Sequence, residues 1–174
     1  MNGSVTGMVT EGGWNFGLLA LFAVQHSGMA RLQVSRRVYA LGSYAAVGLG
    51  WLLWRPMGDV LWRTPAWLWA GWAAGFGLLV WAGASLGAGE LLGWREPGPA
   101  QFREPFLYRY SRHPIYVAVL MILWLRPVMT EGGLLLAVTL TGYLFIGMEF
   151  EERKLERELG ETYRDYQRRV RRLL

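Results

Sequence analysis

The chain contains no cysteine, and only two of its 174 residues are histidines, His26 and His113. The absence of cysteine excludes disulfides, a thiolate nucleophile and a cysteine-based metal site. Two histidines are too few for a histidine-rich metal centre, so no metal site is predicted. The first residues, MNGSVTGMVTEGG, also lack the basic start of a signal peptide. We therefore expect the first apolar block to be retained.

Apolar residues are abundant instead, at 53% of the chain, and they gather in long blocks with the charges between them. Blocks of about 18 apolar residues with few charges are typical of transmembrane helices. The sequence predicts an all-α integral membrane protein, one domain over 1–174, with about five transmembrane helices. The last two form a hairpin, and a compact soluble α-protein is the alternative. The expected spans are 14–30, 38–54, 66–86, 114–126 and 134–150.

The net charge of +5 could indicate a nucleic-acid partner, but the placement of the charges indicates membrane orientation instead. In the five-span arrangement, one side carries only Arg55, Arg63 and Arg126. The positive-inside rule then puts the C-terminus in the cytoplasm and the N-terminus outside, as in a bacterial inner-membrane protein. The block 114–126 is short for a span, which leaves open whether it crosses fully. The opposite side carries the basic C-terminal tail and Arg31, Arg36, Arg37, Arg95, Arg103, Arg109 and Arg112.

A polar junction, YSRHPIY at 110–116, stands directly before the fourth block. Pro114 is suited to the first position of a helix, which makes His113 the N-cap. The amides of Ile115 and Tyr116 would then be unpaired donors at the positive end of the helix dipole, where carboxylates or phosphates bind. Arg112 adds a full positive charge beside them.

Tyrosine rings surround this junction, at Tyr108, Tyr110 and Tyr116. Such rings can hold a cation against their faces. The alternative interpretation is a snorkelling arginine within an interfacial tyrosine belt.

A second junction, GMEFEERKLERELGETYRDYQRRV, starts at Gly147, where the fifth block ends. It brings Glu149, Glu151 and Glu152 to the membrane boundary. Apolar residues at helical spacing beyond them predict an amphipathic C-terminal helix over 151–172, or a helix pair broken at Gly160. A helical hairpin puts both junctions on one side of the membrane. A cationic, amide-rich pocket facing carboxylates suits a cofactor of mixed charge with ribose hydroxyls.

LYRYSRHPIY followed by EERKLERELGETYRDYQRRV resembles the integral-membrane isoprenylcysteine carboxyl methyltransferase family. That family's pattern is RHPxY, then EExxL, then an (F/L)GxxYxxY tail. LFAVQHSGMAR, WRPM and PVMTEGGLLLAVTLTGYLFIGMEFEE look like its bacterial branch that methylates methanethiol. The resemblance therefore covers nearly the whole chain.

The resemblance implies methyl transfer from S-adenosyl-L-methionine by a helical membrane enzyme. Residues 100–103 would cover the cofactor, and Glu151 would bind it from the side opposite to His113. Arg112 suits the cofactor's methionyl carboxylate, and the tyrosine rings suit its sulfonium. The expected cofactor-binding residues are Gln101, Phe102, Arg103, Tyr108, Arg112, His113, Pro114, Ile115, Tyr116, Glu151 and Glu152.

One departure from the family pattern bears on the methyl acceptor. Members that methylate proteins carry an arginine one turn before EExxL, which holds the substrate carboxylate, and this chain has Gly147 there. The departure favours a small or lipophilic thiol over a prenylcysteine carboxylate. A thiol must lose its proton, and His26 is the candidate base, with His113 second. The alternative for His26 is a hydrogen bond between helices.

Arg31 is the other candidate catalytic residue: it could pair with Glu149 or Glu152, or favour a thiolate nearby. A phospholipid N-methyltransferase, a prenylcysteine carboxyl methyltransferase, a sterol reductase and a non-catalytic membrane scaffold stay open as alternatives. Membrane lipid is an expected partner, nucleic acid is not, and the oligomeric state is not predicted.

Overall fold

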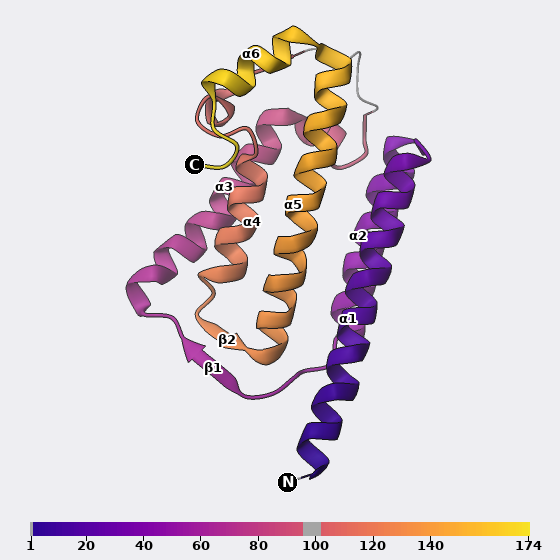
Figure 1. The fold of residues 1–174 in the computed structure, drawn as a ribbon, viewed down its shortest axis with the longest axis vertical. Coiled ribbons are helices and arrows are strands. Elements are labelled where there is room, and N and C mark those ends of the chain that lie inside the picture. The colour runs from indigo at the N-terminus through magenta and orange to yellow at the C-terminus, as the bar shows by residue number, and fades with distance from the viewer. Residues whose placement is uncertain (1, 96–101) are drawn as a thin grey trace.

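The protein is an arc of antiparallel helices in a computed structural model that describes residues 2–95 and 102–174 (Figure 1). Of residues 2–8, 90 and 91 it describes the backbone alone. The helices are α1 (Asn2–Arg31), α2 (Arg36–Leu53), α3 (Trp69–Leu91), α4 (Pro114–Trp124), α5 (Glu131–Leu159) and α6 (Glu161–Arg169). Strands β1 (Val60–Arg63) and β2 (Val128–Thr130) and short 3₁₀ helices at Ala66–Leu68 and Phe106–Arg109 complete the described elements.

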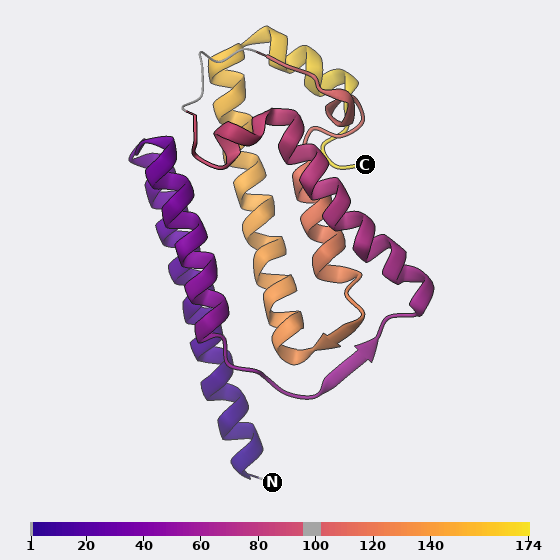
Figure 2. The same ribbon diagram turned by 180° about the vertical axis from the view of Figure 1, so that it is seen from behind.

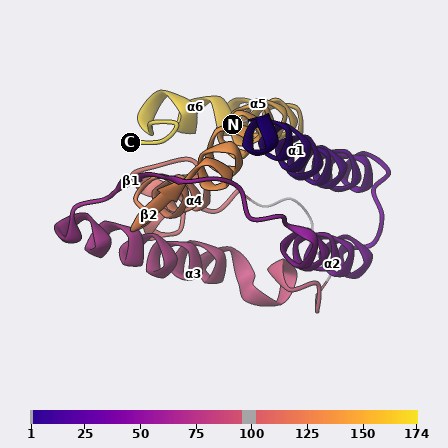
Figure 3. The ribbon, with the colours of Figure 1, turned by 90° about the horizontal axis from the view of Figure 1, so that it is seen from below.

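The first five helices alternate in direction, so their connections gather at two opposite ends (Figures 1 and 2). α1 packs on α2 and α5, and α4 packs on α5 and α3, which gives the spatial order α2–α1–α5–α4–α3 (Figure 3). Gly93, just after α3, closes the arc against α2. A Cβ there would lie 2.8 Å from the Cβ of Ala40, and its φ of +75° suits glycine. We call the end that carries α6 the α6 end.

The expected helical class is confirmed, and two helical stretches, Ala66–Gly89 and Glu131–Leu159, are long and apolar enough to cross a membrane. α4 is apolar but shorter. α1 begins at Asn2, well before the expected start at 14. The buried Asn15 fixes α1 to the end of α2, because its amide donates to the Arg55 carbonyl at 2.7 Å and accepts from the Arg55 amide at 3.0 Å.

The end opposite α6 carries a small antiparallel sheet of β1 and β2 that the sequence analysis did not expect. It joins the connection before α3 to the connection between α4 and α5 (Figure 1). Thr130 then caps α5, its Oγ1 accepting from the amide of Gly133 at 3.1 Å. Such a cap satisfies one of the free amides of the first helical turn.

The expectation of one C-terminal helix over 151–172 was wrong. α5 runs on to Leu159, the chain turns at Gly160 with φ of +58°, and α6 begins at Glu161. The break is the one that glycine permits after a helix, so the alternative of a helix pair is confirmed. α6 folds back because its buried face, Tyr163 and Tyr166 with Val170, packs on Phe102, Leu155 and Leu159.

Residues 170–172 form a C-terminal strap that returns to the start of α4. A parallel β-bridge pairs Ser111 with Arg171. The amide of Arg112 donates to the Arg171 carbonyl at 2.9 Å. These bonds attach the end of the chain to the RHP junction, although the two are far apart in sequence.

Candidate functional site at the α6 end

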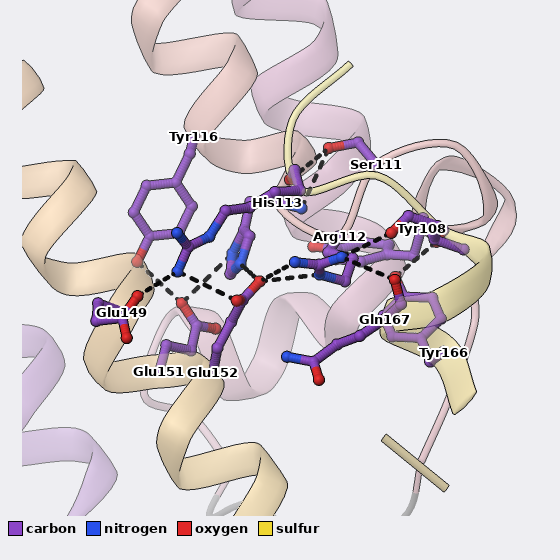
Figure 4. Close-up of polar contacts among 12 residues, drawn as sticks. Tyr108, Ser111, Arg112, His113, Tyr116, Glu149, Glu151, Glu152, Tyr166 and Gln167 are labelled. Atoms are coloured by element: carbon purple, nitrogen blue, oxygen red, sulfur yellow. Dashed lines mark hydrogen bonds and ion pairs between the residues drawn. The ribbon is translucent and has the colours of Figure 1, made fainter. Parts of the chain in front are cut away.

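The RHP junction before α4 and the glutamates of α5 meet at the α6 end, as the sequence predicts (Figure 4). His113 Nε2 lies 3.0 Å from Glu152 Oε1. Arg112 reaches the same carboxylate, with Nε at 2.9 Å and a terminal nitrogen at 2.8 Å. Two side chains that are adjacent in sequence therefore share one buried carboxylate on the neighbouring helix.

Glu152 is only 7% exposed and lies beyond the expected span 134–150. Burial raises the pKa of its carboxyl, but hydrogen bonds from His113 and Arg112 outweigh this effect and hold the pKa below its usual range. Arg172 adds a third contact to this carboxylate, at 3.1 Å. The carboxylate is thus ionised and serves as the central acceptor of the cluster.

All three nitrogens of the Arg112 guanidinium lie within hydrogen-bonding distance of protein oxygens. Besides Glu152, its guanidinium donates to the carbonyls of Val170 at 2.7 Å and Gln167 at 3.3 Å. From the sequence, this side chain was expected to face the carboxylate of a ligand. The structure instead gives it a protein carboxylate and the C-terminal strap, so Arg112 ties three segments together.

Arg172 is a member of this cluster that sequence reasoning missed. It bridges two glutamates, lying 2.8 Å from Glu149 and 3.1 Å from Glu152. No motif signal marks it, because it stands in a run of arginines at the end of the chain. Its role depends on the fold of α6, which the sequence did not specify.

Glu151 is the carboxylate that faces outward, with its side chain 47% exposed. It accepts the hydroxyl hydrogen bond of Tyr116 at 2.9 Å and lies 3.7 Å from His113 Nδ1. The ring of Tyr116 stands perpendicular to that of His113, with centroids 5.1 Å apart. The Glu151 carboxylate is therefore oriented by Tyr116, and its exposed part can contact a ligand.

The start of α4 has the expected form. His113 is the N-cap without a side-chain cap hydrogen bond, and Pro114 is the first helical residue. His113 is 4% exposed, and its backbone amide donates to Ser111 Oγ at 3.2 Å. The amides of Ile115 and Tyr116 follow at the positive end of the helix, whose N-cap His113 neighbours Glu151.

Of the segment expected to cover the cofactor, Phe102 packs edge-on against Tyr166 with ring centroids 5.1 Å apart, and Arg103 is exposed. Gln101 lies outside the described residues. Tyr108 is buried, and its carbonyl accepts from the Tyr166 hydroxyl at 2.6 Å. Burial, with the nearby charge of Glu104, raises the pKa of Tyr166 to about 12, so the phenol stays a donor.

Tyr166→Phe is expected to lower the free energy of unfolding by about 1–2 kcal/mol, because it leaves the Tyr108 carbonyl buried without its donor. Thermal unfolding of the detergent-solubilised protein measures the change. Tyr110→Phe is the matched control, since Tyr110 is 64% exposed. Equal melting temperatures for the two variants would contradict this role of the Tyr166 hydroxyl.

His26 lies in a second polar cluster, between α1 and α2. Its Nε2 is 2.6 Å from the Tyr39 hydroxyl, and its Nδ1 is 3.0 Å from Ser43 Oγ. Tyr143 of α5 lies edge-on to the His26 ring at 6.4 Å and shares a hydrogen bond with Ser27 at 3.1 Å. The structure thus gives His26 interhelical hydrogen bonds, the alternative that the sequence left open.

Tyr39, Ser43 and Tyr143 were also missed by sequence reasoning. Tyr39 and Ser43 are four residues apart on α2, so they share a helix face. That spacing, next to an otherwise apolar run, is the signal that could have identified them.

The expected pairing of Arg31 with Glu149 or Glu152 is not observed among the described residues. Glu149 pairs with Arg153 and Arg172 instead. The Arg31 guanidinium lies over the ring of Phe150, 5.8 Å from its centroid. Arginines of α5 and of the C-terminal strap, Arg153 and Arg172, pair with these carboxylates in place of Arg31.

An open hollow of about 480 Å³ lies beside α6, lined by Phe102, Glu104, Thr162, Asp165, Arg168 and Arg169. Neither Glu151 nor Glu152 lines it. In the part of the chain that the structure describes, no group of three or more metal-ligating side chains could hold a metal ion.

The protein is thus an apolar helical bundle with a mixed-charge site at one end. The site consists of a helix N-terminus, a buried histidine and a pair of glutamates. No family model matches the chain, and no solved structure matches it. Curated proteins do match over most of its length. The chain is 37% identical to methanethiol S-methyltransferase of Mycobacterium tuberculosis, over 92% of this chain and 76% of that protein.

It is 35% identical to methanethiol S-methyltransferase of Pseudomonas deceptionensis, over 90% of this chain and 70% of that protein. Nurim of Sus scrofa is 31% identical, over 82% of this chain and 67% of its own length. These similarities confirm the resemblance found in the motifs. The chain belongs to the methanethiol S-methyltransferase family.

Proposed function

We propose that this protein transfers a methyl group from S-adenosyl-L-methionine to methanethiol or another small or lipophilic thiol. The family relationship supports methyl transfer. The observation that carries the proposal is the half-exposed carboxylate of Glu151 beside the N-terminus of α4. Glu151 and the helix amides supply one acceptor and one donor surface side by side, as a zwitterionic ligand needs.

We place the protein in a membrane, with five spans and with the α6 end in the cytoplasm. Only 17% of the most apolar windows in Ala66–Gly89 and Glu131–Leu159 is buried. Large apolar side chains point outward along the helices, among them Val80 at 72% and Trp51 at 79% exposure. Contiguous apolar surface of this kind needs a lipid or protein environment. The bacterial inner membrane fits the arginine distribution.

The residues around Glu151 fit the chemical groups of the cofactor. The amides of Ile115 and Tyr116 suit its methionyl carboxylate, Glu151 suits its ammonium or ribose hydroxyls, and the Tyr116 ring suits a cation. The cofactor supplies a methyl group on a positively charged sulfur. Phe102 and Arg103 would cover it from the side of α6.

Arg112 and Glu152 enter this proposal as positioning residues. Their mutual contacts set the distance between α4 and α5, and therefore the place of Glu151 relative to His113. Water exclusion and alignment are the main contributions expected from the chain, since charge is cancelled when a thiolate meets a sulfonium.

The acceptor is expected on the inner side of Tyr116, next to Gly147. A Cβ at Gly147 would lie 3.6 Å from the Tyr116 hydroxyl, an ordinary contact distance. The glycine therefore leaves space beside Tyr116 that suits a small acceptor.

Gly147→Leu is expected to lower kcat/KM for methanethiol about tenfold or more, because added methylenes fill the space for the acceptor. Gly147→Ala is the control, since a single Cβ fits there. Dimethyl sulfide in the headspace measures both variants. If Gly147→Leu turns over methanethiol as well as Gly147→Ala does, the acceptor binds elsewhere.

A screen of acceptors tests the proposed substrate class. Purified protein is supplied with methyl-labelled S-adenosyl-L-methionine and, in parallel, with methanethiol, longer alkyl thiols, a phosphatidylethanolamine and a prenylcysteine. The proposal expects label in the thiols. Label in the lipid amine or in the prenylcysteine carboxylate, with none in any thiol, would identify one of the alternative methyltransferases.

A further inference from the structure

The hydrogen bonds around His26 fix which of its nitrogens carries the proton. Ser43 donates its hydroxyl proton to the Tyr39 carbonyl at 2.8 Å, so its oxygen is left as an acceptor for His26. His26 Nδ1 at 3.0 Å must then be the donor. Nε2 is consequently the acceptor, and it faces the hydroxyl of Tyr39 at 2.6 Å.

In this arrangement the Tyr39 hydroxyl donates its hydrogen bond to a base, the Nε2 of His26. The base is in turn oriented by Ser43, so three groups stand in line, as in sites that activate a hydroxyl or thiol. Both nitrogens of His26 are engaged, and Phe22 stacks on its ring at 5.3 Å. His26 therefore meets a substrate through Tyr39 rather than directly.

The pair of Tyr39 and His26 also adjoins α5, the helix that carries Glu151. Tyr143 of α5 neighbours the His26 ring on one side, one helical turn from Gly147, and Tyr116 packs beside Gly147. The cluster of His26 and Tyr39 thus adjoins α5 one helical turn from the space proposed for the acceptor.

The charged groups near this cluster are Arg36 and Glu151. The guanidinium of Arg36 lies over the Tyr39 ring, 5.3 Å from its centroid. Glu151 of α5 opposes negative charge on the Tyr39 oxygen. The Arg36 cation favours a thiolate nearby and opposes positive charge on His26, which favours release of the proton from His26 to solvent.

We propose that Tyr39 takes the proton of the thiol acceptor while passing its own proton to His26. The inference rests on the proposed function and adds the route of the proton. The S–H bond breaks, its proton bonds to Tyr39 Oη, and the former hydroxyl proton of Tyr39 bonds to His26 Nε2. The thiolate keeps the electron pair, which would form the new bond to the methyl carbon while the bond from that carbon to the cofactor's sulfur breaks and leaves its electron pair on that sulfur.

The charge balance of this step closes within the cluster. One proton moves from sulfur to the imidazole, which becomes imidazolium, and Ser43 Oγ accepts the hydrogen bond from Nδ1 throughout. The proton leaves His26 for solvent after the methylated thiol has formed. Tyr39 ends as it began, as a phenol.

Tyr39→Phe tests the step, with Tyr44→Phe on the same helix as the matched control, since Tyr44 is 48% exposed. Because Tyr39→Phe removes the group that accepts the thiol proton, its kcat is expected to fall about 100-fold or more near pH 7. The rate of Tyr39→Phe should recover as pH rises through the pKa of the thiol, because solution then supplies the thiolate. S-adenosyl-L-methionine affinity should stay within about twofold by calorimetric titration.

A tyrosine with a merely structural role would lower the rate equally at all pH values, and this result would overturn the inference. An unchanged rate at neutral pH would overturn it as well. If the wild type binds S-adenosyl-L-methionine but methylates no thiol, the proposed function fails first, and the inference fails with it. The comparison of wild type with variant separates the two failures.

Nitrogen-15 NMR of labelled histidine gives a readout that does not depend on turnover. With His26 and His113 as the chain's two histidines, His113→Gln assigns the spectrum. The inference expects His26 as the Nδ1–H tautomer in the wild type, with an Nε2 shift that moves toward the value for a free acceptor in Tyr39→Phe. An Nε2–H tautomer in the wild type would overturn it.

Discussion

Glu152→Gln is expected to destabilise the protein by about 3 kcal/mol, the largest effect of any single change considered. The substitution removes the charge that Arg112, His113 and Arg172 share. Arg112 is then left nearly buried without its counter-charge, and Arg172 keeps Glu149 alone, which costs more than the loss of a surface pair. Thermal unfolding in detergent should show a melting temperature about 6–12 °C lower.

Glu158→Gln is the matched control on the same helix. Glu158 pairs with Lys154 at 3.7 Å, and both side chains are well exposed, so a change of less than about 0.5 kcal/mol is expected. The buried cluster also predicts that Arg172→Ala destabilises in the same direction, because Glu149 and Glu152 lose a common partner. A melting temperature for Glu152→Gln equal to that of Glu158→Gln would contradict the account of the cluster.

Glu151→Gln is expected to weaken S-adenosyl-L-methionine binding about 10- to 100-fold and leave the fold intact. The carboxylate is half-exposed and takes one protein hydrogen bond from Tyr116, which glutamine can still accept. The loss is therefore that of a charge-assisted contact to the ligand, worth about 1.5–3 kcal/mol. Calorimetric titration measures the dissociation constant, and thermal unfolding without ligand measures the fold.

The two adjacent glutamates thus separate binding from stability. Glu152→Gln should lower the melting temperature, whereas Glu151→Gln should raise the dissociation constant with a near-normal melting temperature. Glu158→Gln again serves as control and should change neither quantity. The same dissociation constant for Glu151→Gln and wild type would show that Glu151 is not a ligand of the cofactor.

Much of this arrangement follows from local signals in the chain. Pro114 and His113 mark a helix start by rules that need no tertiary context, and the structure confirms both positions. The alternation of apolar blocks with charged junctions placed the two junctions at one end. Local signals sufficed for the helix start because capping is decided within one turn of helix.

The partners inside the cluster did not follow from the sequence. Arg112 was expected to meet a ligand, and its observed contact with Val170 depends on the turn at Gly160 and on the strap that follows. Arg172 and Tyr39 carry no motif, and their roles arise from contacts between distant helices. Long-range pairings of this kind depend on the whole topology, which residue patterns alone do not determine.

We propose that this chain moves a methyl group from S-adenosyl-L-methionine to a small thiol. The most direct measurement supplies purified protein with methanethiol and S-adenosyl-L-methionine carrying a deuterated methyl group, and analyses the headspace by mass spectrometry. The account predicts dimethyl sulfide with one deuterated methyl group from the wild type, and far less from Glu151→Gln. Wild-type protein that is folded and binds the cofactor yet releases no labelled dimethyl sulfide, and labels no other thiol, would contradict it.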